Sequence, residues 1–301
     1  MWHFLITDLL PPAEEVAEHL RPRLPGVEAR LARGRREVAA PTWREELLAL
    51  AGHGPLGDRD WPVGCDFAAA AGCLQEAAGW AVVAPVRLAA GLDHVQLERL
   101  APALTPARVA DFNRDFGADA GTLVPCGHVL LWALPRVLEA RTHDPAGLVG
   151  HDIGPRLPTG SAATFLRRWM TEAQMWLHAA EDPGGANALW PWGLGSTAAY
   201  HGLPDLPWAV DTTDVWMATW PRTAADAVDP RHHLTLWRLG DHAGPDGAFA
   251  TADAIWTAEI DRALDLAGEV AVWLAGRRYR LQRRDRWLPW RRWHTPRPWW
   301  R

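Results

Sequence analysis

The stretch LRRWMTEAQMWLHAAEDPGGANALWPWGLG, residues 166–195, combines a helical pattern, a turn and a buried strand. Apolar residues such as Leu166, Met170, Ala173 and Leu177 recur in it at three- and four-residue spacing, so one broad face of a helix is apolar. The sequence DPGG at 182–185 ends this helix, and the pattern predicts a short buried strand over 186–192, closed by glycines. We therefore expect the helix to dock on a sheet.

Other segments extend this pattern in both directions. The apolar run over 2–10 predicts a first, central strand that Pro11 and Pro12 stop. Further strands are expected at 79–97, within 208–220, at 234–239 and in hairpins over 121–134 and 269–282; helices are expected at 13–20, 42–51, 67–78, 105–116 and 252–266. In the last helix we expect Ile255, Ile260, Ala263 and Leu264 to point inward. The prediction is a single α/β domain with a mixed, mostly central sheet and flanking helices.

The amino-acid composition limits the kinds of protein that this chain can be. The 301 residues are 48% hydrophobic with a mean hydropathy of -0.18, enough for one large or two small globular domains. The chain has three cysteines, Cys65, Cys73 and Cys126, and no two of them form a C-x-x-C pair. This spacing argues against a disulfide framework and against a zinc site. Neither a signal-peptide pattern nor a long apolar run occurs. We expect a cytoplasmic protein with no metal and no cofactor.

Residues 277–301 are electrostatically distinct. They contain ten Arg against one Asp, a net charge of +9, so the other residues carry a net charge of -14. Five Trp lie among these arginines. The segment could bind nucleic acid or an anionic membrane surface, but packing on the acidic body of the chain is favoured. We thus expect an α/β domain over 1–276 and a basic segment over 277–301 packed on it.

A second basic cluster runs from Arg30 to Arg36. Glu28 and Glu37 flank it, which favours a solvated helix face over an anion site.

The opening stretch resembles a known family. The bacterial RpfE-type regulatory proteins, some of which are labelled cofactor-independent phosphoglycerate mutase, share Leu166-Arg-Arg, Glu172, Gln174-Met175, His178, Asn187, Trp190, Gly193 and Gly195. Further matches lie at Trp80, Pro85-Val86, Leu88 and Asp93-His94. The resemblance implies an alkaline-phosphatase-like or phosphoglycerate-mutase-like α/β fold and a regulatory role.

The sequence departs from the mutase motif where chemistry would occur. Ala179-Ala180-Glu181 follow His178, so the Asn and the phosphate-binding Arg that the family motif implies are missing. Ala84 and Arg87 replace an Asp and a His, and no metal-activated Ser or Thr nucleophile can be assembled from the pattern. These departures favour a regulatory or ligand-binding protein. The alternative is a phosphomutase- or phosphatase-type enzyme acting on a phosphorylated metabolite, most simply a mutase-like isomerase.

The candidate site is a polar cleft rather than a catalytic centre. Its expected residues are Glu172, Gln174, His178, Asn187, Trp190, Asp93 and His94. Glu172 should face Asn187 across the helix-to-strand turn, as an internal polar lock or as the floor of a binding site. Asp93 and His94 are adjacent, so they can serve one site only in a turn, and Asp93 is expected to cap backbone N–H groups. A protein partner or a small anionic ligand would bind there.

Overall fold

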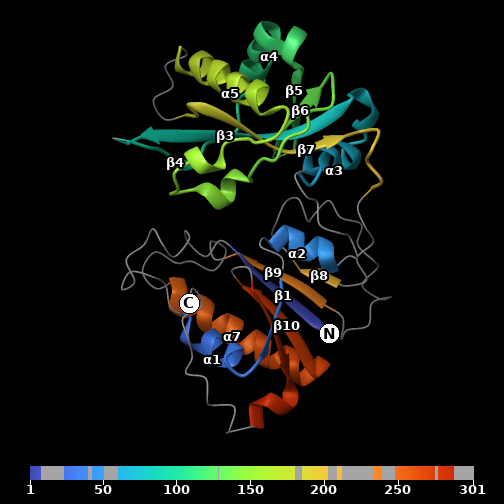
Figure 1. Cartoon of the computed structure of the whole chain (residues 1–301), viewed down its shortest axis with the longest axis vertical. Coiled ribbons are helices and arrows are strands. Elements are labelled where there is room, and N and C mark those ends of the chain that lie inside the picture. Colours follow the sequence, from blue (N-terminus) through green and yellow to red (C-terminus); the bar gives the residue numbers. More distant parts are fainter. Residues whose placement is uncertain are drawn as a thin grey trace. The chain divides into compact units, whose positions relative to one another are not determined.

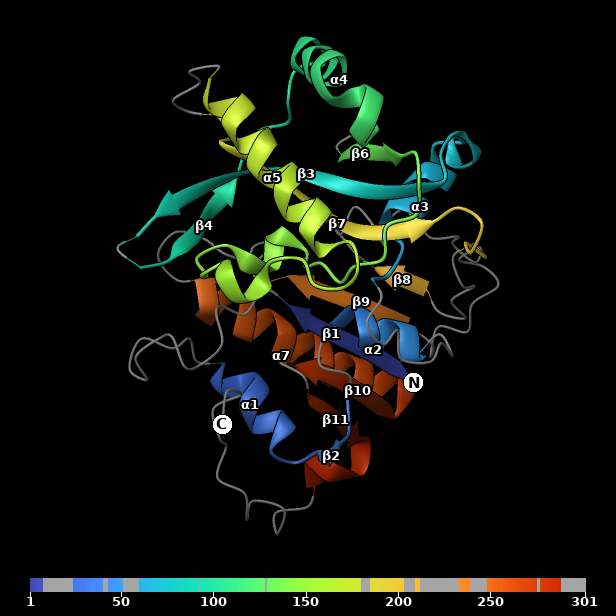
Figure 2. The ribbon, with the colours of Figure 1, turned by 45° about the horizontal axis from the view of Figure 1, so that its top comes forward.

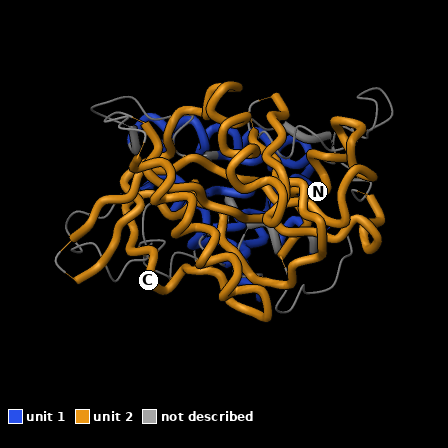
Figure 3. Tube along the Cα trace, turned by 90° about the horizontal axis from the view of Figure 1, so that it is seen from above, with its two compact units in different colours: residues 1–55, 204–301 blue, residues 56–203 orange. Residues whose placement is uncertain are grey.

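The first strand and the last strands of the chain belong to one sheet, whereas the middle of the chain forms another (Figure 1). The computed structural model describes residues 1–7, 24–39, 43–50, 60–91, 93–127, 129–179, 185–202, 209–211, 233–238, 248–274 and 277–287. Contacts divide the chain into unit 1, residues 1–55 and 204–301, and unit 2, residues 56–203 (Figure 3). The α/β class with mixed sheets is confirmed, although two sheets in two units replace the one central sheet expected.

Unit 1 is built on a six-stranded sheet in the order β2-β11-β10-β1-β9-β8. Its strands are β1 (Trp2–Thr7), β2 (Arg35–Glu37), β8 (Ala209–Asp211), β9 (His233–Arg238), β10 (Glu269–Leu274) and β11 (Arg277–Gln282). β8, β9, β1 and β10 are mutually parallel, and β11 and β2 add antiparallel pairs at one side. All six residues of β1 are buried, as its continuous apolar run predicts for a central strand.

Helices α1 (Pro25–Leu31) and α7 (Ala248–Ala267) cover one face of this sheet (Figure 2). Phe4 of β1, Val27 of α1 and Trp256 of α7 belong to one buried cluster. Ile260, Ala263 and Leu264 point inward as expected, but Ile255 is 40% exposed because it lies beside the stripe that Ala252, Trp256 and Ile260 form. Helix α2 (Trp43–Leu50) contacts β1 and supplies the buried Leu47.

The described part of unit 2 contains five antiparallel-paired strands. These are β3 (Gly79–Ala90), β4 (Val95–Leu100), β5 (Thr122–Cys126), β6 (Val129–Leu134) and β7 (Ala188–Ser196). β3 is the long central strand, because it pairs with β4, β6 and β7. The expected hairpin over 121–134 is confirmed as β5 and β6.

Three helices cover the sheet of unit 2. α4 (Pro106–Ala120) and α5 (Ala163–His178) pack on one face, where Trp132 and Trp169 stack with ring centroids 4.2 Å apart. α3 (Val63–Ala70) contacts β3 and β7 (Figure 1). The helix expected over 67–78 is wrong in its bounds: α3 ends before Gly72, whose φ is 76°, and a short 3-10 helix, η2 (Leu74–Glu76), follows. Two more 3-10 helices, η3 (Pro145–Leu148) and η4 (Gly154–Arg156), lie in the connection to α5.

The starts of α4 and α1 show two kinds of capping. Thr105, the first residue of the helix expected over 105–116, caps α4, because its side chain accepts a hydrogen bond from the N–H of Arg108 at 3.3 Å. The first turn of α1 is capped from elsewhere: Asp253 of α7 accepts hydrogen bonds from the N–H groups of Gly26 at 2.8 Å and Val27 at 2.9 Å. The local sequence predicts the first cap but not the second.

The basic segment begins inside unit 1. Arg277–Gln282 is the strand β11, and the 3-10 helix η7 (Arg283–Trp287) follows it. Arg278 lies 2.6 Å from the buried carboxylate of Glu46, and Arg280 lies 3.0 Å from Glu37. Residues 277–287 are therefore part of the sheet and its border. Residues 288–301, like the helix expected over 13–20, lie outside the described residues, as does most of 208–220.

No helix in the described part of the chain is long and apolar enough to cross a membrane.

Candidate functional site

The polar residues predicted on α5 lie on its outer side. Glu172 accepts a hydrogen bond from Arg168 at 2.7 Å, and its side chain is 38% exposed. Gln174 and His178 are exposed as well. The buried face of α5 is instead formed by Leu166, Trp169, Met170, Ala173 and Leu177. The expectation that Glu172 faces the sheet is wrong, because a carboxylate near the border of the apolar stripe turns to water and to the neighbouring Arg.

Asn187 has a different partner from the one expected. Its Oδ1 accepts from the backbone N–H of Leu88 at 2.7 Å, and its Nδ2 donates to the carbonyl of Leu88 at 2.8 Å. Leu88 lies where the pairing of β3 with β4 shifts register. The Asn187 side-chain amide thus makes the two hydrogen bonds to Leu88 that the backbone of a neighbouring strand would otherwise make. Asn187 lies immediately before β7 begins. The predicted Glu172–Asn187 pair does not form.

The other predicted residues also lie apart. Trp190 is buried in β7, and its Nε1 donates to the carbonyl of His143 at 2.8 Å. Asp93 and His94 do lie in a turn, between β3 and β4, where their side chains are 2.9 Å apart. The hydrogen bond to His94 lowers the pKa of Asp93, and the same bond raises the pKa of His94. The seven predicted residues therefore occupy a helix surface, the interior and a hairpin tip rather than one cleft.

The Gly-x-Gly motif has a packing role. A Cβ at Gly193 would lie 2.7 Å from Cβ of Val63, and one at Gly195 would lie 2.6 Å from Sγ of Cys65. Gly193 also has a φ of 64°, which residues with a side chain adopt rarely. These two glycines let the first turn of α3 lie directly against β7.

Unit 2 contains a partly buried carboxylate that the sequence pattern did not reveal. Asp60 accepts hydrogen bonds from the N–H of Thr142 at 2.7 Å, from the Thr142 hydroxyl and from the N–H of Leu194 at 3.4 Å. Burial raises the pKa of the Asp60 carboxyl, although the bonds from Thr142 and Leu194 lower it. Burial lowers the pKa of His143, the residue next to Thr142. The Asp60 carboxylate therefore connects its own segment to the loop that contains Thr142 and, through Leu194, to β7.

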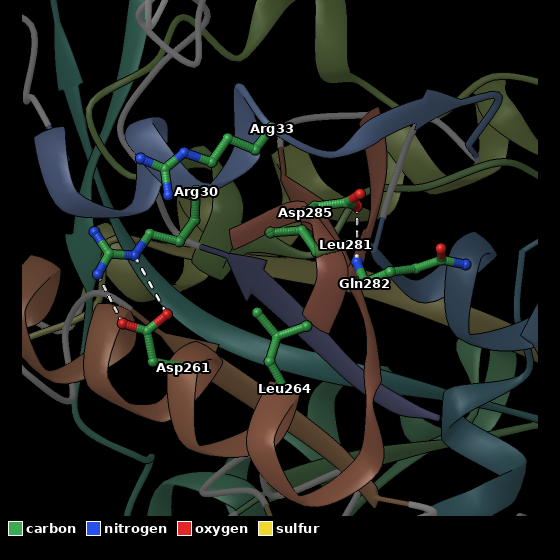
Figure 4. A pocket seen from close by; sticks show the side chains of 7 residues that line it. All are labelled: Arg30, Arg33, Asp261, Leu264, Leu281, Gln282 and Asp285. Atoms are coloured by element: carbon green, nitrogen blue, oxygen red, sulfur yellow. Dashed lines mark hydrogen bonds and ion pairs between the residues drawn. The ribbon is translucent and has the colours of Figure 1, made fainter. Parts of the chain in front are cut away.

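A cleft with charged walls lies in unit 1, between α1, α7 and the end of β11. Its volume is about 320 Å³. Arg30 and Arg33 line it from α1 and the turn after it, and Asp261 lines it from α7 (Figure 4). Leu264 and Leu281 form its apolar part; Asp285 and the backbone of Gln282 complete it (Figure 4). A volume of this size accommodates a small metabolite.

The charged groups of the cleft are held in place. Asp261 binds Arg30 through both oxygens, at 3.4 Å to Nε and 2.7 Å to Nη2. Asp285 is 4% exposed, and its Oδ2 accepts the N–H of Gln282 at 3.0 Å. Arg30 retains N–H groups beyond the two that Asp261 uses, since a guanidinium has five. The cleft is thus preorganised, with two cationic and two anionic side chains.

The basic cluster Arg30 to Arg36 is the signal that could have located this cleft. Its flanking acids favoured a solvated helix face, yet α7 and β11 cover part of that face in the fold. The cover comes from residues more than 200 positions away, so the local pattern could not show it.

Across the described residues, no group of three or more His, Cys, Asp or Glu side chains is arranged to hold a metal ion.

Comparison with known proteins yields a distant likeness. Neither a family model nor a curated protein matches the chain. Among solved structures, the cofactor-independent phosphoglycerate mutase from Thermoplasma acidophilum aligns with 93% of this chain and 88% of its own, at 14% identity and a TM-score of 0.32. The resemblance to that mutase is a distant structural one.

Proposed function

We propose that this chain is a regulatory, ligand-binding protein that takes a small anionic ligand in the cleft of unit 1. The cleft beside Arg30 and Arg33 is the observation that carries the proposal. Two guanidinium groups on one wall give an anion several N–H donors, and the Arg30–Asp261 pair fixes one of them in position. The missing mutase motif residues after His178 favour this binding role over phosphoryl transfer.

The binding test uses small anions of known structure. Inorganic phosphate and pentanoate would be titrated into the full chain, with ligand-observed NMR and calorimetry as readouts. For whichever anion the wild type binds, Arg33→Gln should lower the affinity by about tenfold or more. The reason is that a hydrogen bond to a charged group contributes roughly 1.5–3 kcal/mol. Arg262→Gln is the matched control, because Arg262 lies on α7 beside Asp261 but pairs with Glu259 at 2.7 Å.

Saturation by neither anion, or equal weakening by both variants, would contradict the proposal. In the second case a diffuse positive field, and not the cleft, would attract the anion.

The enzymatic alternative has its own assay. Interconversion of 2- and 3-phosphoglycerate would be followed with magnesium or manganese present. We expect no turnover, because the sequence lacks the Asn and Arg that the mutase motif would place after His178. Turnover that disappears on chelation would support the mutase-like isomerase instead.

A further inference from the structure

We infer that unit 2 is a self-contained inserted module, because a clasp made of its own side chains holds its entry and its exit together. The entry lies near Asp60 and the exit near Tyr200, inside the bounds 56–203 of unit 2. The clasp consists of residues from these two ends: Asp60, Trp61, Asp66, Thr197 and Tyr200. None of them lines the cleft of unit 1, so the clasp and anion binding can be tested separately.

The carboxylate of Asp66 is the centre of the clasp. Asp66 lies in the first turn of α3 and is 0% exposed. The indole Nε1 of Trp61, from the entry, donates to its Oδ2 at 2.8 Å. The hydroxyl of Tyr200, from the exit, hydrogen-bonds to the same side chain, and burial together with the Asp66 charge raises the pKa of Tyr200. The hydroxyl therefore keeps its proton and remains a donor. A buried carboxylate needs such donors, and here they come from both ends of the module.

The backbone of the exit also lies directly against the entry. A Cβ at Gly195 of β7 would be 2.4 Å from Cβ of Pro62, a separation too short for any side chain. The neighbouring N–H of Leu194 points to the carboxylate of Asp60, with 3.4 Å between the nitrogen and Oδ2. The last strand of the module therefore packs on the residues with which the module starts.

Thr197 binds the exit to the sheet of the module. Its N–H donates to the carbonyl of Ala78 at 3.0 Å, and its hydroxyl donates to the carbonyl of Ala77 at 2.8 Å. Ala77 and Ala78 directly precede β3, the central strand. The exit is thus fixed to the sheet as well as to the entry, and every partner named belongs to unit 2.

The apolar cores of the two units share no member among the described residues. The buried cluster of unit 2 lies between Ala81 and Leu194, whereas that of unit 1 combines members from 2–31 with members from 237–281. A segment with its own core and with adjacent ends is the arrangement that domain insertion tolerates. We therefore expect unit 2 to keep its fold without covalent links to the rest of the chain, and to open as one cooperative unit.

The experiment cuts both links in the folded full chain. One specific protease site is inserted between Pro55 and Leu56, and a second between Leu203 and Pro204, outside the clasp. After both cuts, hydrogen exchange resolved by peptide should show the protection of β3 and β7 within about twofold of the uncut chain. The reason is that the clasp, and not the two peptide links, holds the ends of the module together.

Two substitutions then test the clasp itself. In the cut chain, Trp61→Phe and Tyr200→Phe each remove a donor to Asp66. Each should speed exchange over residues 194–200 by about tenfold or more, because hydrogen bonds to a charged group are strong. Trp176→Phe is the matched control for the tryptophan. Its Nε1 donates at 2.9 Å to Asp115, between α5 and α4, so exchange over 194–200 should change by less than about twofold.

Loss of protection throughout β3 and β7 after the two cuts would show that unit 2 depends on its covalent links, and would overturn the module. Unchanged exchange over 194–200 in both clasp variants would overturn the clasp. An equal effect of Trp176→Phe would also overturn it, since loss of stability elsewhere in unit 2 would then open the exit. Faster exchange in β1 and β10 of the uncut variants would show that unit 1 shares the stability of unit 2, which contradicts a self-contained module.

Discussion

Unit 1 and unit 2 use their partly buried polar side chains differently. In unit 2 these side chains bind the backbone of their own unit: Asn187 binds Leu88, Asn113 binds Leu123, and Asp60 binds Thr142 and Leu194. In unit 1, Asp253 of α7 likewise caps the backbone of α1, but Arg30, Asp261 and Asp285 line a cleft. A polar residue in a motif can be required to hydrogen-bond backbone groups that the strands of the sheet do not pair. The presence of such a residue is therefore weak evidence for a functional site.

The sheets explain the difference. The four parallel strands in unit 1 pair without a register shift. The strands of unit 2 are antiparallel and shift register within β3 at two places. At the shift beside Leu88, the Asn187 amide binds both the backbone N–H and the carbonyl that the irregular pairing leaves. Four predictions test this contrast, from the largest expected effect to the smallest.

Truncation after Gly276 should unfold unit 1 and spare unit 2. It removes β11 with the buried Leu281 and with Arg278, the close partner of the buried Glu46. Removing one partner of a buried ion pair alone costs about 3–5 kcal/mol. Hydrogen exchange resolved by peptide should show loss of protection in β1 and β10 but not in β3 and β7. Truncation after Trp287 is the control, and equal melting of the two truncated chains would refute the prediction.

Asn187→Ala should destabilise unit 2 by about 1–3 kcal/mol, because both backbone groups of Leu88 lose their partner. Asn113→Ala should have a similar cost, since Asn113 makes the same two bonds with Leu123, at 2.7 Å and 2.8 Å. Denaturant unfolding measures both effects. A cost below about 0.5 kcal/mol for both variants would show that water replaces these amides without penalty.

Acidification should destabilise unit 2 through His143. Burial is the main reason that its pKa lies below the usual 6.5. The hydrogen bond to the Arg156 carbonyl and the charge of Asp60 oppose this shift, whereas the charges of Arg156 and Arg141 add to it. Because the folded-state pKa is lowered, the stabilising contribution is present above pH 6.5 and is lost as the pH falls from there through the folded-state pKa. Unfolding free energies of wild type and His143→Gln, measured between about pH 5 and 8, should converge at the acid end.

A parallel offset between wild type and His143→Gln at every pH would mean that His143 does not titrate with folding.

Glu172→Ala should have the smallest effect, within about 0.5 kcal/mol, because an exposed i, i+4 pair on a helix contributes about that much. Its combination with Asn187→Ala should be additive, since Glu172 and Asn187 bind different partners. Thermal or denaturant unfolding of the two single variants and the double variant would measure this. An interaction energy above about 1 kcal/mol between the two substitutions would show that Glu172 and Asn187 do contact each other, as the sequence pattern suggested.

Much of the local structure followed from the sequence. The strand β1, the α5 helix with its buried Trp169 and Leu177, the cap at Thr105 and the hairpin of β5 and β6 were all predictable from periodicity and turn chemistry. These features depend on neighbours within about ten residues. The bounds of α3 were predicted less well, and its first turn packs closely against Gly193 and Gly195 of a distant strand, a contact that the local pattern does not contain.

The partners of polar side chains needed the fold. Glu172 and Asn187 are close in sequence and were expected to pair, yet Asn187 binds a residue 99 positions away. Arg30 was assigned to a solvated helix face, yet it lines a cleft with Asp261, 231 positions away. The sequence alone determined which segments are apolar on one face, because that pattern is repeated every few residues. Which carboxylate meets which arginine, and where space remains between them, was decided by strand pairing across the whole chain, because one hydrogen bond or ion pair leaves no periodic trace in the sequence.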